Sequence, residues 1–304
     1  MTQGTADGAA RADDPPAGNT DLPLAGSAAG VVGGGTMGSG IVHVLLAAGA
    51  EVVLVESDEA ALDRATGLVR ASLDGAEQRG KLTEPIADLL ARLTATTDRA
   101  RLATASLVVE AVPELLDLKR QLLADLERIA DPAAVLASNT SSLSLAAIGS
   151  GLEHPERLVG MHFFNPVPAQ KLVEVIRAER TSDETLAAAR HVAESLGKQV
   201  VVVRDSPGFA TSRLGLALGL EAIRMVEDGV ASPEDIDTAM VLGYRHPMGP
   251  LRLGDLVGLD VRLGIAEYLA TQLGPRFEPP ALLRRMVDEG KLGRKSGQGF
   301  YTWD

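Results

Sequence analysis

A lone histidine and a lone glutamate stand in apolar, strand-like segments near the middle of the chain. The stretch GMHFFNPVPAQKLVEVI covers residues 160–176, with His162 in its first apolar run and Glu174 in its second. If the two runs are neighbouring strands joined by the proline-containing corner, the two side chains lie opposite each other on one face. The carboxylate would then fix the tautomer of the imidazole and stabilise its protonated form, which predicts a general acid/base. The alternative is a core histidine satisfied by a structural glutamate.

A glycine-rich stretch has the spacing of a dinucleotide-binding turn. Gly33, Gly35 and Gly38 form a G-x-G-x-x-G pattern between an apolar strand and a helix that we expect from about Met37 to Ala48. The first glycine makes the tight turn, the second lets the backbone approach a pyrophosphate, and the third lets helix and strand pack closely. Because the pattern lies between a predicted strand and a predicted helix, it favours a nucleotide site over an ordinary glycine-rich turn.

The residues around this turn predict which dinucleotide binds. Thr36 and Met37 open the helix whose free N–H groups face the phosphates. Glu56 ends the following strand, where a carboxylate accepts hydrogen bonds from the adenosine ribose and repels a 2′-phosphate. We therefore expect NAD rather than NADP, the alternative being an incidental surface glutamate.

A polar segment, SNTSSL at residues 138–143, follows an apolar strand. It falls at the carboxyl end of that strand, the edge at which open α/β sheets bind ligands. Its hydroxyl and amide groups are candidate substrate or cofactor contacts. The alternative is a polar turn that caps a helix.

Composition excludes several classes of function. The 304 residues carry a formal net charge of -12, which argues against nucleic acid or anionic membranes as the main partners. The absence of cysteine excludes disulfides, thiolate zinc sites and cysteine nucleophiles. No metal-ligand spacing and no membrane-spanning apolar run is present, so we expect no metal, no membrane and a cytoplasmic location.

The order of apolar segments predicts three regions. Residues 1–27 are rich in Gly, Ala, Asp and Pro and are expected to be a disordered tail. Alternating strands and helices over residues 28–205 predict a Rossmann-type, doubly wound α/β sheet. Residues 206–304 have helical periodicity and predict a smaller all-helical domain.

Eight motifs follow one another along the chain from about residue 28 to the C-terminus. They are VVGGGTMGSGI, VVEAVPE, ASNTSSLSL, GMHFFNPVP, KLVEVI, DSPGF, HPMGPLRLGDLVGLD and GKLGRKSGQGFY. In this order and spacing they resemble the NAD-dependent L-3-hydroxyacyl-CoA dehydrogenase family, close to its short stand-alone 3-hydroxybutyryl-CoA members. The resemblance implies reversible hydride transfer between NAD and C3 of a short-chain L-3-hydroxyacyl-CoA, and a helical domain that forms a homodimer and closes over the acyl chain.

The resemblance also implies residue roles. His162 would exchange a proton with the substrate 3-oxygen, Glu174 would orient it, and Ser141 would touch both the 3-oxygen and the nicotinamide region. Two positions fall near CoA contacts of the family, although the family pattern has lysine at the second: Ser72 and Arg79. Further cofactor contacts are implied at Glu56, Glu114, Lys119, Asn165 and Lys295.

One position departs from the family pattern. After Pro207-Gly208-Phe209 the family has an asparagine that helps to hold the substrate carbonyl, and this chain has Ser212. A serine is shorter and has one donor where the amide has two, so it reaches the same oxygen only at closer range or through water. The change leaves open a neutral substitution, a compact or polar acyl group, or a substrate carried on an acyl carrier protein. A non-catalytic NAD-binding homologue is a further alternative, against which the retained histidine, glutamate and serine weigh.

Overall fold

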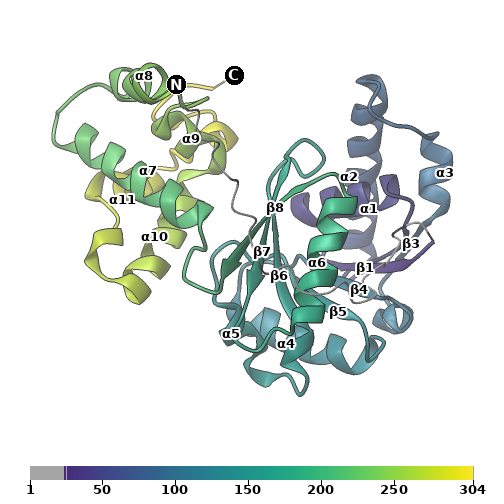
Figure 1. Ribbon diagram of the computed structural model, residues 1–304. Helices are drawn as coiled ribbons and strands as arrows, with labels where there is room; N and C mark the ends of the chain where they lie inside the picture. The colour runs from purple at the N-terminus through teal and green to yellow at the C-terminus, as the bar shows by residue number, and fades with distance from the viewer. Residues whose placement is uncertain (1–23, 25, 304) are drawn as a thin grey trace, which may run out of the picture.

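A computed structural model describes residues 24 and 26–303 of the chain (Figure 1). The predicted tail therefore lies mostly outside the described residues. Its last part belongs to the fold, since Leu24 is buried in the core and the Gly26 N–H donates to the Gly49 carbonyl at 3.1 Å. The described fold thus begins a few residues before the predicted boundary.

Eight strands form one sheet in the order β3-β2-β1-β4-β5-β6-β7-β8. All neighbouring strands are parallel except β6 and β7, which are antiparallel. The predicted doubly wound α/β fold is confirmed. The strands are β1 (Ala28–Val32), β2 (Glu51–Val55), β3 (Leu93–Thr96), β4 (Leu107–Glu110), β5 (Val135–Ser138), β6 (Leu158–Phe163), β7 (Leu172–Arg177) and β8 (Gln199–Arg204).

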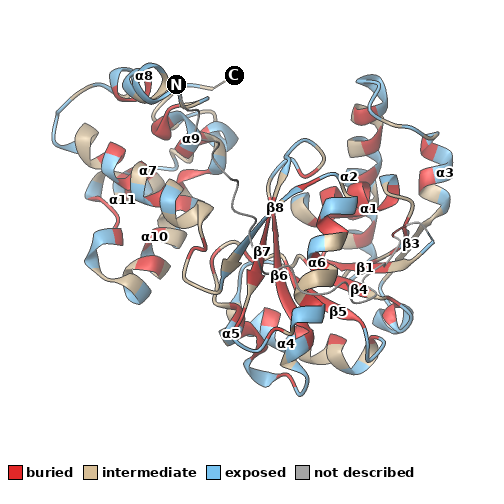
Figure 2. Ribbon diagram, in the orientation of Figure 1, coloured by how far each residue is buried: buried red, intermediate tan, exposed pale blue. Residues whose placement is uncertain are grey.

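Helices cover both faces of this sheet. Strands β4, β5 and β6 are buried along their whole length, as expected for parallel strands that are near-continuous apolar runs (Figure 2). One core cluster joins the sheet to α1, α2 and α6, and a second joins it to α4 and α5. These helices, with a short one at the edge, are α1 (Thr36–Ala47), α2 (Glu59–Gln78), α3 (Ile86–Ala91), α4 (Leu116–Ile129), α5 (Leu145–Ile148) and α6 (Asp183–Ser195).

The edge of the sheet beyond β2 was not predicted. Strand β3 is the four-residue segment LTAT and follows the six-residue helix α3. Neither segment is long enough to show a clear period, and β3 is only half-buried at the sheet edge. Pairing with β2 rather than local sequence therefore defines it.

The chain then enters a helical part through residues 205–210 (Figure 1). A third core cluster fills its interior, with Leu216 and Leu220 of its first helix packed with Leu259 and Leu283. The buried Asp255 accepts hydrogen bonds from the main chain of Phe300 and Tyr301, which fixes the C-terminal aromatic segment. None of the described helices is long and apolar enough to cross a membrane. The helices are α7 (Thr211–Glu227), α8 (Pro233–Tyr244), α9 (Pro250–Val257), α10 (Leu259–Leu273) and α11 (Ala281–Asp288).

Candidate active site

The antiparallel pairing of β6 and β7 brings His162 and Glu174 together. The two residues are direct register partners, which confirms the predicted placement. His162 Nδ1 lies 2.8 Å from Glu174 Oε2, and the residues are 7% and 0% exposed. Since the carboxylate occupies Nδ1, Nε2 is the ring nitrogen left for a further hydrogen bond.

Glu174 is held as an anion by the start of the helical part. Its Oε1 accepts from the main-chain N–H groups of Ala210 and Thr211, at 3.2 and 2.9 Å, and its Oε2 accepts from the Thr211 hydroxyl at 2.8 Å. Burial alone would raise the pKa of Glu174, but the hydrogen bonds from His162 and Thr211 outweigh it and hold the pKa below its usual value. The N-terminus of α7 therefore stabilises the charge that orients the imidazole.

We expect Thr211→Val to lower the free energy of unfolding by about 1.5–3 kcal/mol at neutral pH, because it removes the hydrogen bond from the Thr211 hydroxyl to the ionised Glu174. A lowered folded-state pKa gives stability that is complete above the ordinary value of 4.5 and is lost as pH falls through the folded pKa. The difference between variant and wild type should thus shrink in acid. Urea denaturation over a pH series measures it.

Thr271→Val is the matched control, since the exposed Thr271 hydroxyl donates only to the Tyr268 carbonyl, at 2.7 Å. Its effect should not change with pH. A Thr211→Val effect that is equally constant would contradict the assigned charge of Glu174.

The loop after β5 is organised by Glu114. One of its oxygens accepts from the Thr140 hydroxyl at 2.7 Å, from the Ser141 N–H at 2.8 Å and hydroxyl at 3.2 Å, and from the Ser142 N–H at 3.2 Å. The other oxygen lies 3.2 Å from Lys119 Nζ. Together these bonds hold the pKa of Glu114 below its usual value, although burial acts in the opposite direction. Glu114 thus positions the loop that carries Ser141.

A buried ion pair between Lys119 and Glu110 adjoins this loop. The sequence pattern did not identify Glu110. Lys119 Nζ lies 2.7 Å from Glu110 Oε1, and Glu110 Oε2 accepts from the Ser138 hydroxyl at 2.6 Å. Asn139 adds a second link, because its Oδ1 accepts from the Phe163 N–H at 2.9 Å. Phe163 follows His162, so the serine loop and the histidine strand are fixed to each other.

Ser212, the position that departs from the family pattern, reaches the same loop. Its hydroxyl donates to the Ser141 carbonyl at 3.0 Å, across 71 residues of sequence. It lies in the first turn of α7, next to Thr211, which bonds Glu174. The serine loop, the histidine and glutamate pair and the start of α7 therefore form one connected site.

The corner between β6 and β7 is fixed from two sides. Lys198 is 8% exposed, and its Nζ donates to the carbonyls of Val167 and Gln170 at 2.6 and 2.8 Å. Val167 packs against Gly40 of α1, where an added Cβ would lie 2.8 Å from the valine Cβ. Asn165 lies in this corner, and its carbonyl accepts from Gln170 Nε2 at 3.5 Å. The corner that joins the histidine and glutamate strands is thus locked to the helix that follows the glycine-rich turn.

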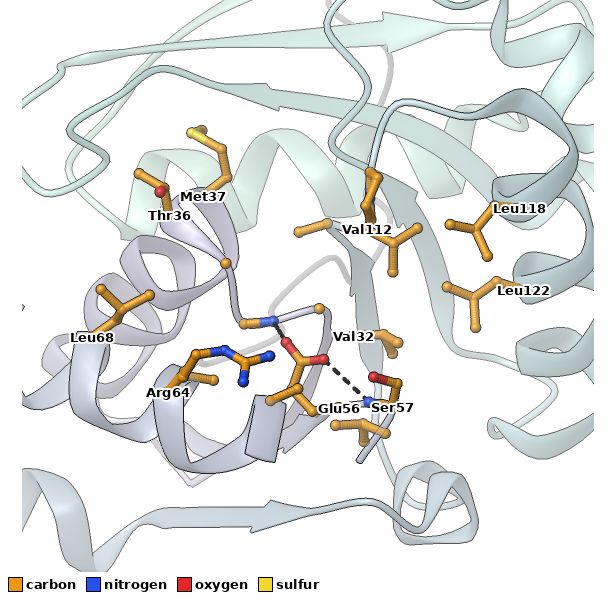
Figure 3. A pocket seen from close by; sticks show the side chains of 18 of the residues that line it. Val32, Thr36, Met37, Glu56, Ser57, Arg64, Leu68, Val112, Leu118 and Leu122 are labelled. Atoms are coloured by element: carbon orange, nitrogen blue, oxygen red, sulfur yellow. Dashed lines mark hydrogen bonds between the residues drawn. The ribbon is translucent and has the colours of Figure 1, made fainter. Parts of the chain in front are cut away.

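A cavity of about 700 Å³ opens at the glycine-rich turn (Figure 3). Gly33, Gly35, Thr36 and Met37 line one side of it, and residues 111–113 with α4 line the other. Glu56 lies beside the turn, where it accepts from the Gly34 N–H at 2.5 Å and from the Ser57 N–H at 3.1 Å (Figure 3).

The geometry of the turn fits a dinucleotide. Gly33 has a φ of +93°, which favours glycine, and a Cβ on Gly38 would lie 1.7 Å from the Gly33 carbonyl oxygen. The tight turn and the close approach predicted for these glycines are both present. The Glu56 carboxylate follows β2 directly and lies beside this turn, so the residues present fit a dinucleotide such as NAD.

Comparison with known proteins identifies the family. Residues 28–206 match the 3-hydroxyacyl-CoA dehydrogenase NAD binding domain, and residues 208–303 match the C-terminal domain of the same enzymes. The chain belongs to the 3-hydroxyacyl-CoA dehydrogenase family. The resemblance seen in its motifs is confirmed, and with it NAD as the cofactor of this dehydrogenase.

Individual relatives of this dehydrogenase cover nearly all of it. A probable 3-hydroxybutyryl-CoA dehydrogenase of Deinococcus radiodurans is 45% identical over 275 residues, which are 90% of this chain and 99% of the relative. The crystal structure of Mycobacterium tuberculosis FadB2 superposes with a TM-score of 0.89 at 46% identity, covering 92% of this chain and 100% of that one. The crystal structure of (S)-3-hydroxybutyryl-CoA dehydrogenase from Ralstonia eutropha superposes with a TM-score of 0.86 at 41% identity. The match covers 91% of this chain and 99% of that one.

Other predicted site residues of the dehydrogenase lie away from the cavity. Lys295 pairs with Asp260 Oδ2 at 2.5 Å inside the helical part. The Ser72 hydroxyl lies 2.8 Å from His43 Nδ1. His43 is buried, and burial with the nearby charges of Lys198 and Arg79 lowers its pKa to about 4. Ser72 and Arg79 thus belong to a separate, electropositive group beside the α1 helix.

Proposed function

We propose that this dehydrogenase acts on short-chain L-3-hydroxyacyl-CoA, with 3-hydroxybutyryl-CoA and acetoacetyl-CoA as the reference pair. The observation that carries the proposal is the buried His162 and Glu174 pair, whose carboxylate is held ionised by the start of α7. The relatives from Deinococcus radiodurans and Ralstonia eutropha carry the name 3-hydroxybutyryl-CoA dehydrogenase, the latter with the (S) configuration. Both facts support the same reaction for this chain.

In this proposal His162 Nε2 removes the proton of the 3-hydroxyl group. Glu174 stabilises the imidazolium that forms, since it is ionised and bonded to Nδ1. In the reverse direction the imidazolium returns the proton to the 3-oxygen. Bound NAD supplies the acceptor for the C3 hydride.

Ser141 and Ser212 bind the reacting oxygen. The Ser141 hydroxyl exchanges its long bond to Glu114, 3.2 Å, for one to the substrate, while Glu114 keeps the Thr140 hydroxyl and the Ser141 N–H. The Ser212 hydroxyl, which donates to the Ser141 carbonyl in this structure, reaches the substrate directly or through water. We assign NAD to the main chain of Gly33, Gly35 and Gly38 and to contacts with Thr36, Met37, Glu56, Glu114, Lys119, Asn165 and Lys295, and CoA to Ser72 and Arg79.

We further propose that two copies associate through their helical parts, the residues after about Asp205. Large apolar side chains are exposed there, including Leu214 at 71%, Leu242 at 75% and Tyr244 at 77%. Exposed apolar groups concentrated in one part of a chain mark association surfaces. Sedimentation of the purified protein should give twice the mass of the chain, and a monomer at micromolar concentration would rule the dimer out.

The reaction is tested by mixing the protein with NADH and acetoacetyl-CoA and following the loss of nicotinamide absorbance. We expect turnover, together with (S)-3-hydroxybutyryl-CoA as the product on a chiral column. Acetoacetyl-acyl carrier protein serves as the competing substrate. Turnover of the carrier-protein thioester alone would replace CoA in the proposal, and NADH binding without turnover of either would favour a non-catalytic homologue.

A further inference from the structure

Arg262 of α10 is a buried cation that has no acidic partner among the residues that the structure describes. It is 9% exposed, and its Nη1 lies 3.6 and 3.9 Å from the positions that Cβ atoms on Gly215 and Gly219 of α7 would take. Its Nε is fully enclosed and makes no hydrogen bond, and within residues 26–303 no carboxylate pairs with the guanidinium. The two glycines leave the space in which the guanidinium lies.

A buried guanidinium charge destabilises the fold unless an anion pairs with it. An ion taken from water into a protein interior loses much of its solvation, and a buried ion without a partner leaves that loss uncompensated. Burial lowers the pKa of Arg262, yet a guanidinium remains protonated in proteins. We therefore expect Arg262 to bind an anion that does not come from the described residues of the chain.

The position of Arg262 relative to the active site indicates the source of that anion. Ser212, Gly215 and Gly219 are spaced by three and four residues, so they follow one another along a single face of α7. At 1.5 Å per residue, Gly215 and Gly219 lie about 5 and about 10 Å beyond Ser212. Apart from Arg262 Nη1, nothing lies within 4 Å of a Cβ placed on Gly215. Gly215 is half-buried and Gly219 is buried. A face of α7 without side chains at these two positions thus leads from Ser212 to the unpaired guanidinium.

We propose that Arg262 binds a carboxylate at the far end of the acyl chain. The enzyme then takes 3-hydroxyacyl-CoA substrates in which one carboxyl group of a dicarboxylic acid forms the CoA thioester and the other is free. The inference rests on the proposed function, because C3 of the substrate must lie beside His162 and Ser141. The planar fork of a guanidinium matches a carboxylate with two parallel hydrogen bonds. Gly215 and Gly219, beside Arg262, lie about 5–10 Å along α7 from Ser212. A distance of this order corresponds to a few methylene groups between C3 and the terminal carboxylate.

The test compares two substrates of equal length that differ only at the far end, 3-oxoadipyl-CoA and 3-oxohexanoyl-CoA, with NADH as the reductant. We expect wild-type kcat/KM to be about 100-fold higher for the carboxylated substrate, since a site built around a buried charge rejects an analogue that leaves it unpaired. Arg262→Met should remove that preference, and Arg262→Lys, which keeps the charge without the fork, should keep part of it. Arg285→Met, an exposed arginine of α11, should leave both rates unchanged.

Each outcome decides one point. Acetoacetyl-CoA turnover without a preference between the six-carbon substrates overturns the inference and leaves the proposed function standing. If the wild-type protein turns over none of the CoA substrates, the inference and the proposed function are both overturned. If Arg262→Met keeps the preference but dissociates a dimer that Arg285→Met leaves intact, the anion is a carboxylate of a second copy, and the substrate assignment is wrong. Arg262→Lys decides the question if the methionine variant does not fold.

Discussion

His162→Gln should lower kcat for acetoacetyl-CoA reduction by about 100- to 10,000-fold, the usual contribution of a positioned acid or base. The amide can still donate a hydrogen bond to Glu174, so the strand pair and the buried carboxylate keep their partner. It cannot deliver a proton at the atom that faces the 3-oxygen. NADH titration by fluorescence should give an unchanged affinity, because the cavity at the glycine-rich turn does not include His162.

The matched control is His154→Gln. His154 is exposed and pairs only with the exposed Glu156. It should retain wild-type kcat and NADH affinity. Equal activity of the two variants would refute the role of His162, and loss of NADH binding in His162→Gln alone would show a folding defect instead of a missing acid.

Gly38→Ala should weaken NADH binding by at least about 100-fold and destabilise the fold by about 1–3 kcal/mol, the usual cost of overpacking. The new Cβ would lie 1.7 Å from the Gly33 carbonyl oxygen and 2.9 Å from its carbonyl carbon. Both are backbone atoms of the turn, so helix α1 has to move away from β1. That movement withdraws from the pyrophosphate the N–H groups that bind it.

Gly67→Ala in α2 is the control for Gly38→Ala. No atom lies within 4 Å of an added Cβ, and Gly67 is inside a helix, where alanine is favoured by about 1 kcal/mol. This variant should be slightly more stable and bind NADH normally. Fluorescence titration and urea denaturation measure both quantities, and an intact NADH affinity in Gly38→Ala would contradict the close approach assigned to that glycine.

The sequence predicted those parts of the site that depend on short-range pattern. Two apolar runs joined by a proline-containing corner specify the register of His162 with Glu174, because alternation along a strand decides which side chains share a face. The glycine spacing likewise specified the turn at Gly33. Both features need only neighbouring elements of the chain.

The supporting contacts could not be predicted, because they join segments that are distant in sequence. The bond from Ser212 to the Ser141 carbonyl and the bonds from Glu114 to the serine loop arise from how whole elements pack. Lys198, buried against two carbonyls of the corner, reads in the sequence as an ordinary surface lysine between a helix and a strand. An isolated basic residue carries no pattern that reveals its burial.

Glu174 makes proton transfer and domain geometry interdependent. The Glu174 carboxylate on β7 bonds the imidazole through Oε2 and accepts from the N–H groups of Ala210 and Thr211, at the start of α7, through Oε1. Any rotation that lifts α7 from the sheet strips the carboxylate of these donors and, because its charge is buried, favours its protonation. His162 would then lose the ionised partner that stabilises its protonated form. The segment at residues 205–210, which leads from the sheet to α7, thus links the charge on Glu174 to the position of the helical part.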